Sequence, residues 1–421
     1  MISPRSFLMS LSALLFLAAC SPESSDFISV EPWEAPPETP IPQYDPIPEQ
    51  KFEWITEDGG QSQTFSPQVD ILFVTDNSES MKSAQENLSR NIDRFTAKLM
   101  SNQMIDYHIG VISTWDSSER FAQMKKDSYK PGDLRLVKTS AGKYLSKRFI
   151  GKGEKAHLAS TLKIGITPYS QGGPEIEEFF SPLAAALENT GRGASNEGFF
   201  RPEAQLVVIF LTDADDSTSK ISPEQMARLL VDFKGGKSEK VAVYGVLVRP
   251  EDPDNIKDYD LRVHPKYHPE CFDGKKNNGK CSGFGPQRIE ELIVAANAGT
   301  GTPEEIRSKY IMSIASKNFG TDLAKMGDDI TVKTLAKEIF LNYRPRLDSK
   351  TGQLMIRVRY GSPDQLAAGK GQLIPQGAKG GWLYDPEANS VHLSGDINYQ
   401  YKEGARFAVD LIPLTIANSS N

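Results

Sequence analysis

The amino-acid sequence predicts an α/β fold: a doubly wound, mostly parallel sheet, followed by a small C-terminal β domain. Two largely apolar runs, at 69–74 and 206–211, have the length of strands that are buried on both faces, as strands of a parallel sheet are. Segments with apolar residues at steps of three and four alternate with such runs, which favours helices packed on a parallel sheet. From residue 343 the pattern changes to short alternating runs between turn residues, which is typical of antiparallel strands.

The individual elements follow from the same two periodicities, a period of two for strands and of 3.6 for helices. The predicted strands of the parallel sheet are 69–74, 107–114, 206–212, 241–248 and 310–315. The predicted helices are 81–99, 157–164, 176–187, 223–233 and 323–341. The predicted strands of the C-terminal domain are 353–360, 381–385, 390–395 and 406–411.

The first 19 residues have the features of a signal peptide. Arg5 supplies a positive charge, and the apolar run 7–19 that follows it is too short to span a membrane comfortably. Residues 17–20, Leu-Ala-Ala-Cys, resemble the bacterial lipobox, which implies cleavage before Cys20 and lipidation of that cysteine. Ser21 after the cysteine implies the outer membrane, so the predicted location is the bacterial cell envelope. A signal peptide cleaved without lipidation is the alternative.

Residues 20–66 are predicted to be a disordered linker. The segment is rich in proline, glutamate and serine, and it has too little apolar surface to offset the entropy lost on ordering. An extended spacer that lifts the following domain off the bilayer fits this composition. An arm that docks through Trp33 or Trp54 is the alternative.

Three oxygen-bearing side chains lie between the first predicted strand and its helix. Asp76, Ser78 and Ser80 occupy alternate positions, and a turn can direct such side chains into one hollow. The strand predicted at 206–212 also ends in an aspartate, Asp213, and open α/β sheets bind ligands at the carboxyl ends of their strands. Oxygen-only ligands suit Mg²⁺, Mn²⁺ or Ca²⁺. Alternatively, a serine caps the helix while Asp76 accepts hydrogen bonds from backbone N–H groups.

This arrangement resembles the von Willebrand factor type A (vWA) domain and its metal-ion-dependent adhesion site (MIDAS). The family pattern is Asp-x-Ser-x-Ser after the first strand, a threonine on a middle loop and an aspartate after the fourth strand. Asp76, Ser78, Ser80 and Asp213 match it. The resemblance implies that these residues hold a divalent cation, Mg²⁺ before Mn²⁺ or Ca²⁺. It also implies that a carboxylate from a protein partner completes the coordination of that ion.

The middle loop departs from the family pattern. The family threonine often follows a glycine pair, and here Pro174 follows the glycines at 172 and 173. Thr167 is the nearest upstream threonine and is our candidate fifth ligand, with Ser170 and Glu175 as other oxygens within reach. A carboxylate at this position would strengthen ion binding and weaken the attraction of the ion for an outside ligand.

The predicted vWA domain, 67–342, contains an insertion at about 250–286 that is rich in proline and glycine. Its two cysteines, Cys271 and Cys281, are expected to form a disulfide because the compartment is oxidising. A zinc site that also uses His264 and His268 is the alternative. Residues 343–421 form the predicted C-terminal β domain.

Composition and motifs narrow the function classes. The 421 residues carry a formal net charge of −7 with both signs mixed along the chain, so we expect no nucleic-acid partner. The sequence contains neither a glycine-rich phosphate loop nor a Gly-x-Ser-x-Gly elbow, so we expect no enzyme activity. The prediction is a membrane-anchored protein that captures a carboxylate-bearing protein through its MIDAS. The alternatives are a structural envelope protein whose metal orders loops, or a metal-dependent enzyme or regulatory subunit.

Overall fold

The structure, a computed structural model, describes residues 53–57, 67–117, 129–174, 176–249, 272–273, 276–277, 286–400 and 404–414. Among these residues no helix has both the length and the hydropathy that crossing a lipid bilayer requires. Cys20, Cys271 and Cys281 lie outside these ranges, as do the signal peptide and nearly all of the insertion. Lipidation and the disulfide therefore stay predictions.

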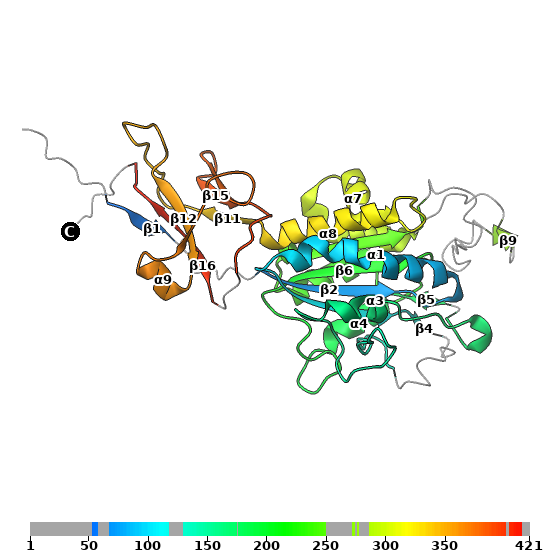
Figure 1. Cartoon of the computed structure of the whole chain (residues 1–421). Helices are drawn as coiled ribbons and strands as arrows, with labels where there is room; N and C mark the ends of the chain where they lie inside the picture. Colours follow the sequence, from blue (N-terminus) through cyan, green and yellow to red (C-terminus); the bar gives the residue numbers. More distant parts are fainter. Residues whose placement is uncertain are drawn as a thin grey trace, which may run out of the picture. The chain divides into compact units, whose positions relative to one another are not determined.

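The centre of the fold is a parallel sheet of five strands in the order β10-β7-β6-β2-β3 (Figure 1). Numbered along the chain within this sheet, the strands lie in the order 2-1-3-4-5, which is a doubly wound order with its switch point between β2 and β6. Every residue of β6 and β7 is buried, which is why the strands appear in the sequence as continuous apolar runs. The predicted fold class is confirmed. The strands are β2 (Gln68–Thr75), β3 (Asp106–Ser113), β6 (Gln205–Thr212), β7 (Val241–Leu247) and β10 (Ile311–Ser313).

Helices cover both faces of this sheet. Phe73 packs edge-on against Phe95 of α1, whereas Phe210 packs in the same way against Phe180, the first residue of α4. Phe73 is paired with Ile209 in the sheet, so Phe210 points to the other face, and α1 and α4 lie on opposite faces. The helices are α1 (Lys82–Ser101), α3 (Leu158–Leu162), α4 (Phe180–Glu188), α5 (Pro223–Phe233), α6 (Gln287–Ala296), α7 (Pro303–Tyr310) and α8 (Phe319–Leu335).

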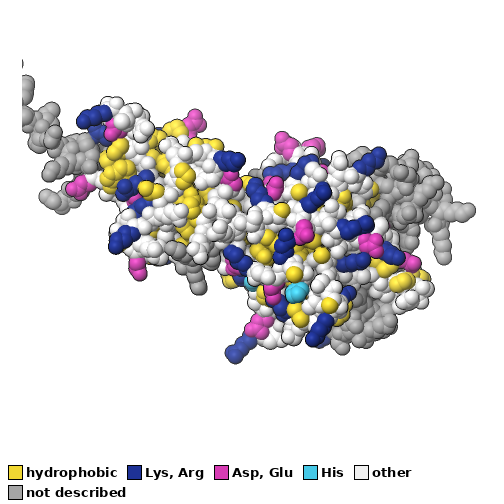
Figure 2. All heavy atoms as spheres, viewed as in Figure 1, with side chains coloured by type: hydrophobic (Ala, Val, Ile, Leu, Met, Phe, Trp, Pro, Cys, Tyr) yellow, Lys and Arg dark blue, Asp and Glu magenta, His cyan; other side chains and the backbone are white. Residues whose placement is uncertain are grey.

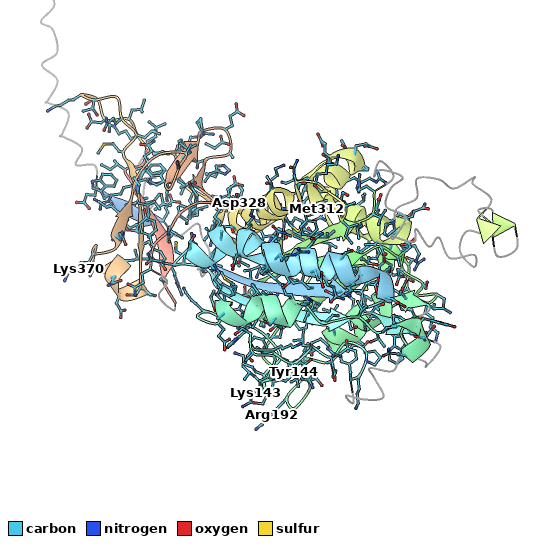
Figure 3. All side chains as sticks on the ribbon, turned by 45° about the vertical axis from the view of Figure 1, so that its right-hand side comes forward. Lys143, Tyr144, Arg192, Met312, Asp328 and Lys370 are labelled. Atoms are coloured by element: carbon cyan, nitrogen blue, oxygen red, sulfur yellow. The ribbon has the colours of Figure 1, made fainter. Side chains whose placement is uncertain are left out.

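Helices α1 and α8 lie side by side (Figure 1), and in Figure 3 Asp328 marks α8 while Met312 marks the edge strand β10. Their close approach depends on Gly327 of α8. A Cβ atom at this position would lie 1.9 Å from the carbonyl oxygen of Phe95, so any larger residue would force the two helices apart.

The C-terminal region contains the predicted antiparallel strands in two sheets, β1-β16-β12-β13 and β11-β15-β14. Several exposed large hydrophobic side chains belong to it, among them Leu347, Leu373 and Leu383, while acidic and basic side chains are interspersed on the face in Figure 2. Its elements are β1 (Ile55–Glu57), β11 (Lys337–Phe340), β12 (Ile356–Gly361), α9 (Pro363–Ala367), β13 (Gln372–Ile374), β14 (Trp382–Asp385), β15 (Ser390–Leu393) and β16 (Arg406–Leu411). Two further short antiparallel pairs are β4 (Trp115–Asp116) with β5 (Glu177–Glu178), and β8 (Phe272–Asp273) with β9 (Lys276–Asn277).

The structure differs from the prediction at the borders of this region. The linker prediction is wrong for residues 55–57, because β1 pairs with β16 and supplies hydrogen-bonding partners for an edge strand. Thr56 also donates a hydrogen bond of 2.8 Å to Asp410. The last helix ends at Leu335 rather than at 341, since the chain turns into β11, which pairs with β15. Strand structure therefore begins before residue 343.

Candidate metal centre

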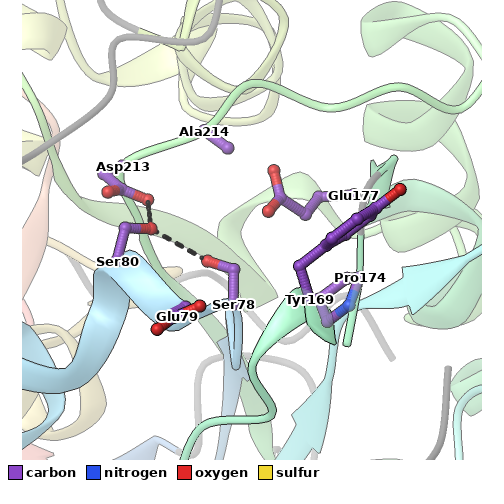
Figure 4. A pocket seen from close by; sticks show the side chains of 8 residues that line it. All are labelled: Ser78, Glu79, Ser80, Tyr169, Pro174, Glu177, Asp213 and Ala214. Atoms are coloured by element: carbon purple, nitrogen blue, oxygen red, sulfur yellow. Dashed lines mark hydrogen bonds between the residues drawn. The ribbon is translucent and has the colours of Figure 1, made fainter. Parts of the chain in front are cut away.

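The four residues that match the MIDAS pattern meet at the switch point of the sheet. Asp76 directly follows β2 and Asp213 directly follows β6, and these strands are neighbours. Both aspartates are buried, with 0% and 3% of their surface exposed. The Ser80 hydroxyl lies 3.1 Å from the Ser78 hydroxyl and donates a hydrogen bond of 3.2 Å to Asp213 Oδ1 (Figure 4). The structure thus joins two predicted groups that are 133 residues apart in the chain.

The carboxylate of Asp76 shapes the turn that presents the serines. Its Oδ1 accepts the backbone N–H of Ser78 at 2.7 Å, and its Oδ2 accepts the hydroxyl of Thr212 at 3.0 Å. An aspartate that accepts from the residue two positions ahead forms an Asx turn, which here carries the chain from β2 into the next helix. Ser78 precedes the 3-10 turn Glu79–Met81 and makes no side-chain cap bond to it, which contradicts the helix-cap interpretation of this serine.

Two side chains that the sequence analysis missed hold this turn in place. Gln85 of α1 is buried, and its amide donates to the carbonyl of Asp76 at 2.9 Å and to that of Gly165 at 3.0 Å. Asn77 accepts the Ser113 hydroxyl at 2.9 Å, so it ties the turn to the end of β3. The sequence offered one signal for Gln85: it is a polar residue next to the apolar stripe of the predicted helix.

The middle loop places Glu177, and not Thr167, among the residues that line the pocket. The backbone N–H of Thr167 donates to the carbonyl of Asn77 at 2.9 Å, but the residues that line the pocket do not include Thr167. Ser170 is exposed and also does not line it, and Glu175 lies outside the described residues. The lining residues are Ser78, Glu79, Ser80, Tyr169, Pro174, Glu177, Asp213 and Ala214 (Figure 4). The structure therefore favours Glu177 at this position, and Thr167 as a ligand stays a prediction.

The acidic residues after Asp213 have another role. Asp215 accepts the backbone N–H of Arg288 at 3.0 Å, and burial raises the pKa of Asp215 to about 7. Asp216 accepts the N–H groups of Phe179 and Phe180 at 2.8 and 3.1 Å, and burial raises its pKa as well. These contacts attach the loop after β6 to the first turns of α6 and α4, where backbone N–H groups lack helical partners.

The donor set fits a hard divalent cation. Carboxylate and hydroxyl oxygens converge on a pocket of about 440 Å³, a volume that includes its open mouth, and none of the described residues that line it is a lysine or arginine. Within the described part of the chain, no group of three or more histidine, cysteine or acidic side chains is arranged to hold a metal. The centre therefore depends on its serine hydroxyls as well as its carboxylates.

No protein-family model matches the sequence, and no curated protein matches it. Solved structures do. Proximal thread matrix protein 1 from the mussel byssus is 13% identical over 66% of this chain and 50% of that chain, with a TM-score of 0.35. A second structure of that protein, with a TM-score of 0.34, has a zinc-occupied MIDAS motif.

Two bacterial structures are similar as well. The von Willebrand factor type A from Catenulispora acidiphila is 11% identical, covers 83% of this chain and 59% of that chain, and has a TM-score of 0.30. The pilus adhesin SpaC from Lactobacillus rhamnosus GG is 10% identical, covers 82% and 39%, and has a TM-score of 0.32. The chain spans half the length of the byssus protein that it matches.

Proposed function

We propose that this chain is a vWA-type binding protein, anchored by lipid on Cys20 in the bacterial cell envelope. Asp76, Ser78, Ser80 and Asp213 hold a divalent cation, Mg²⁺ before Mn²⁺ or Ca²⁺, and the site captures a carboxylate of a protein partner. The convergence of the two segments at the switch point, with Ser80 bonded to Asp213 at 3.2 Å, is the observation that supports this proposal best.

Each side chain has a distinct task. A bound divalent cation supplies positive charge that attracts an incoming carboxylate. Ser78 and Ser80 contribute neutral oxygens, so they hold an ion without cancelling its charge. Asp76 is oriented by the N–H of Ser78 and the hydroxyl of Thr212, so its carboxylate is fixed before any ion arrives. Tyr169, with 47% of its surface exposed, stands on the pocket wall where a partner would make contact.

The lining of the pocket supports binding over catalysis. Among the described residues, the lining contains hydroxyls and carboxylates, but neither a histidine nor the lysine or arginine that a phosphoryl-transfer site uses to cradle phosphate. A structural envelope protein whose ion only orders loops would use the same residues. Ion-dependent capture of a partner separates these two functions.

The test compares wild-type protein with Asp76→Asn, which removes the charge and keeps the shape. Titration calorimetry with Mg²⁺ and Mn²⁺ should show a loss of ion affinity of at least about a hundredfold, or about 2.7 kcal/mol. Asp93→Asn, a change of an exposed aspartate on α1, should bind like wild type. Unchanged affinity in Asp76→Asn would rule out the adhesion site.

The partner is sought by a pull-down from envelope extract in Mg²⁺ or in EDTA. Wild-type protein should retain a protein in Mg²⁺ only, and Asp76→Asn should retain it in neither buffer. Ion binding without any ion-dependent capture would favour the structural alternative. The anchor is tested separately: Cys20→Ser should move the protein from the membrane fraction to the soluble fraction, and an unlipidated wild-type N-terminus in mass spectrometry would contradict it.

A further inference from the structure

We infer that Glu177 is a built-in ligand of this ion site, and that it competes with the carboxylate of the partner. The inference rests on the proposed function and extends it to a residue that the MIDAS pattern does not contain. The protein then supplies the ion with a carboxylate of its own, which a partner must displace in order to bind.

The backbone of Glu177 is held from two sides. Strand β5 pairs with β4, which places Glu177 opposite Asp116, just after the end of β3. The carbonyl of Glu177 also accepts the N–H of Ser217 at 2.9 Å, in the loop after β6. The residue is therefore positioned by the loops of both neighbours of β2, the strand that leads to Asp76.

The side chain of Glu177 faces the pocket. Neighbouring residues of a strand point to opposite sides, and the Glu178 carboxylate accepts the hydroxyl of Ser181 in the first turn of α4. Glu177 instead lines the pocket, where Figure 4 shows its carboxylate across the gap from Ser80 and Asp213. Pro174, which follows the glycine pair, lines the same wall and has no hydroxyl to offer.

The carboxylate of Glu177 changes the charge of the site. Besides Asp76 and the lining residues Glu79 and Asp213, Glu177 adds one more negative charge around a cation with two positive charges, whereas a threonine in its place would add none. Extra ligand charge tightens ion binding. It also repels an incoming carboxylate, so a partner must displace Glu177 from the ion before it can bind.

The experiment uses the full chain with Mn²⁺ as the probe, in wild type, Glu177→Gln and the matched control Glu178→Gln. Calorimetry should show that Glu177→Gln binds Mn²⁺ about tenfold more weakly, since the ion loses one negatively charged ligand. Water-proton relaxation should show more exchangeable water on the Mn²⁺ of this variant. Added acetate should displace that water at lower concentration than in wild type, because no internal carboxylate competes with it.

The outcomes separate this inference from the proposed function. Wild-type behaviour of Glu177→Gln in both measurements, or an equal loss in Glu178→Gln, would overturn the inference and leave the ion site intact. Failure of the wild-type protein to bind Mn²⁺ would overturn both. Circular dichroism of each variant confirms that it is folded, and Glu177→Asp, which keeps the charge, should restore most of the wild-type affinity for Mn²⁺.

Discussion

Asp70 and Asp76 lie at opposite ends of β2, and different kinds of groups donate hydrogen bonds to their buried carboxylates. Both carboxylates are fully buried. Asp70 is met by Arg201, whose backbone N–H donates to Oδ2 at 2.7 Å and whose Nε donates to Oδ1 at 2.8 Å. Asp76 accepts the N–H of Ser78 and the hydroxyl of Thr212, which carry no charge.

The difference shows which end of the sheet is built for a ligand. A buried carboxylate needs a compensating partner, and at the amino end the protein supplies it: Arg201 bridges Asp70 and Asp106 and also bonds the carbonyl of Val69. At the carboxyl end the two donors to Asp76 named above are an amide and a hydroxyl, and the described residues that line the pocket include the carboxylates of Glu79, Glu177 and Asp213. We expect changes at the amino end to alter stability, and changes at the carboxyl end to alter ion binding.

The largest effect on stability is expected for Arg201→Met. This change leaves Asp70 buried without its guanidinium, so the free energy of unfolding near neutral pH should fall by about 3–5 kcal/mol. Urea denaturation in EDTA measures it. Asp76→Asn, measured in the same buffer, keeps an oxygen acceptor for Ser78 and should cost about 1 kcal/mol or less. Equal losses of unfolding free energy in Arg201→Met and Asp76→Asn would show that the two ends of the sheet do not differ in this way.

A smaller effect is expected from the titration of Asp70. Burial raises the pKa of Asp70 from 3.8 to about 6, against the opposing attraction of Arg201 and Lys234. The folded protein therefore binds this proton more tightly than the unfolded chain, and the stability that this provides is lost as pH rises from about 4 to about 7. Relative to Asp70→Asn, which cannot titrate, wild type should lose up to about 3 kcal/mol over this range.

Urea denaturation at several pH values measures this loss as the difference between the two proteins. His108, 3.8 Å from Asp70, titrates in both proteins, so its contribution largely cancels. Burial lowers the pKa of His108, and its Nδ1 donates to the carbonyl of Phe199 at 2.9 Å, so the ring is neutral near pH 7. Parallel stability curves for wild type and Asp70→Asn would show that Arg201 fully offsets the burial of Asp70.

Much of the fold and half of the site follow from local patterns. The apolar runs of β2 and β6 identify buried strands, and because parallel strands end at one edge, Asp76 and Asp213 were expected to meet. What was missed depends on contacts between distant segments. Ile55 pairs with Leu411 in a sheet, and Arg201 reaches Asp70 across 131 positions. No periodicity encodes such pairs.

The middle loop shows the same limit within the site. Residue type alone favoured Thr167, because the family ligand is a threonine. The pairing of β5 with β4 instead aims Glu177 at the pocket, and the N–H of Thr167 is used to hold Asn77. The place of Glu177 on the pocket wall thus depends on backbone pairing over about sixty positions, which a motif cannot report.

A small effect on both stability and ion binding is expected for Ser113→Ala, and it sharpens the comparison at the carboxyl end. Ser113 is buried at the end of β3. Within the described part of the chain, its hydroxyl donates one hydrogen bond, of 2.9 Å, which holds the Asn77 side chain. Its loss should lower the free energy of unfolding by about 1 kcal/mol. The turn keeps the bond from Asp76 N–H to Leu211 and the contact of Gln85 with the Asp76 carbonyl, so Mn²⁺ affinity should fall by no more than about threefold. Urea denaturation and calorimetry measure the two quantities on one preparation. A tenfold loss of affinity would mean that the ion site is held in shape by Asn77 and β3 rather than by the Asx turn of Asp76.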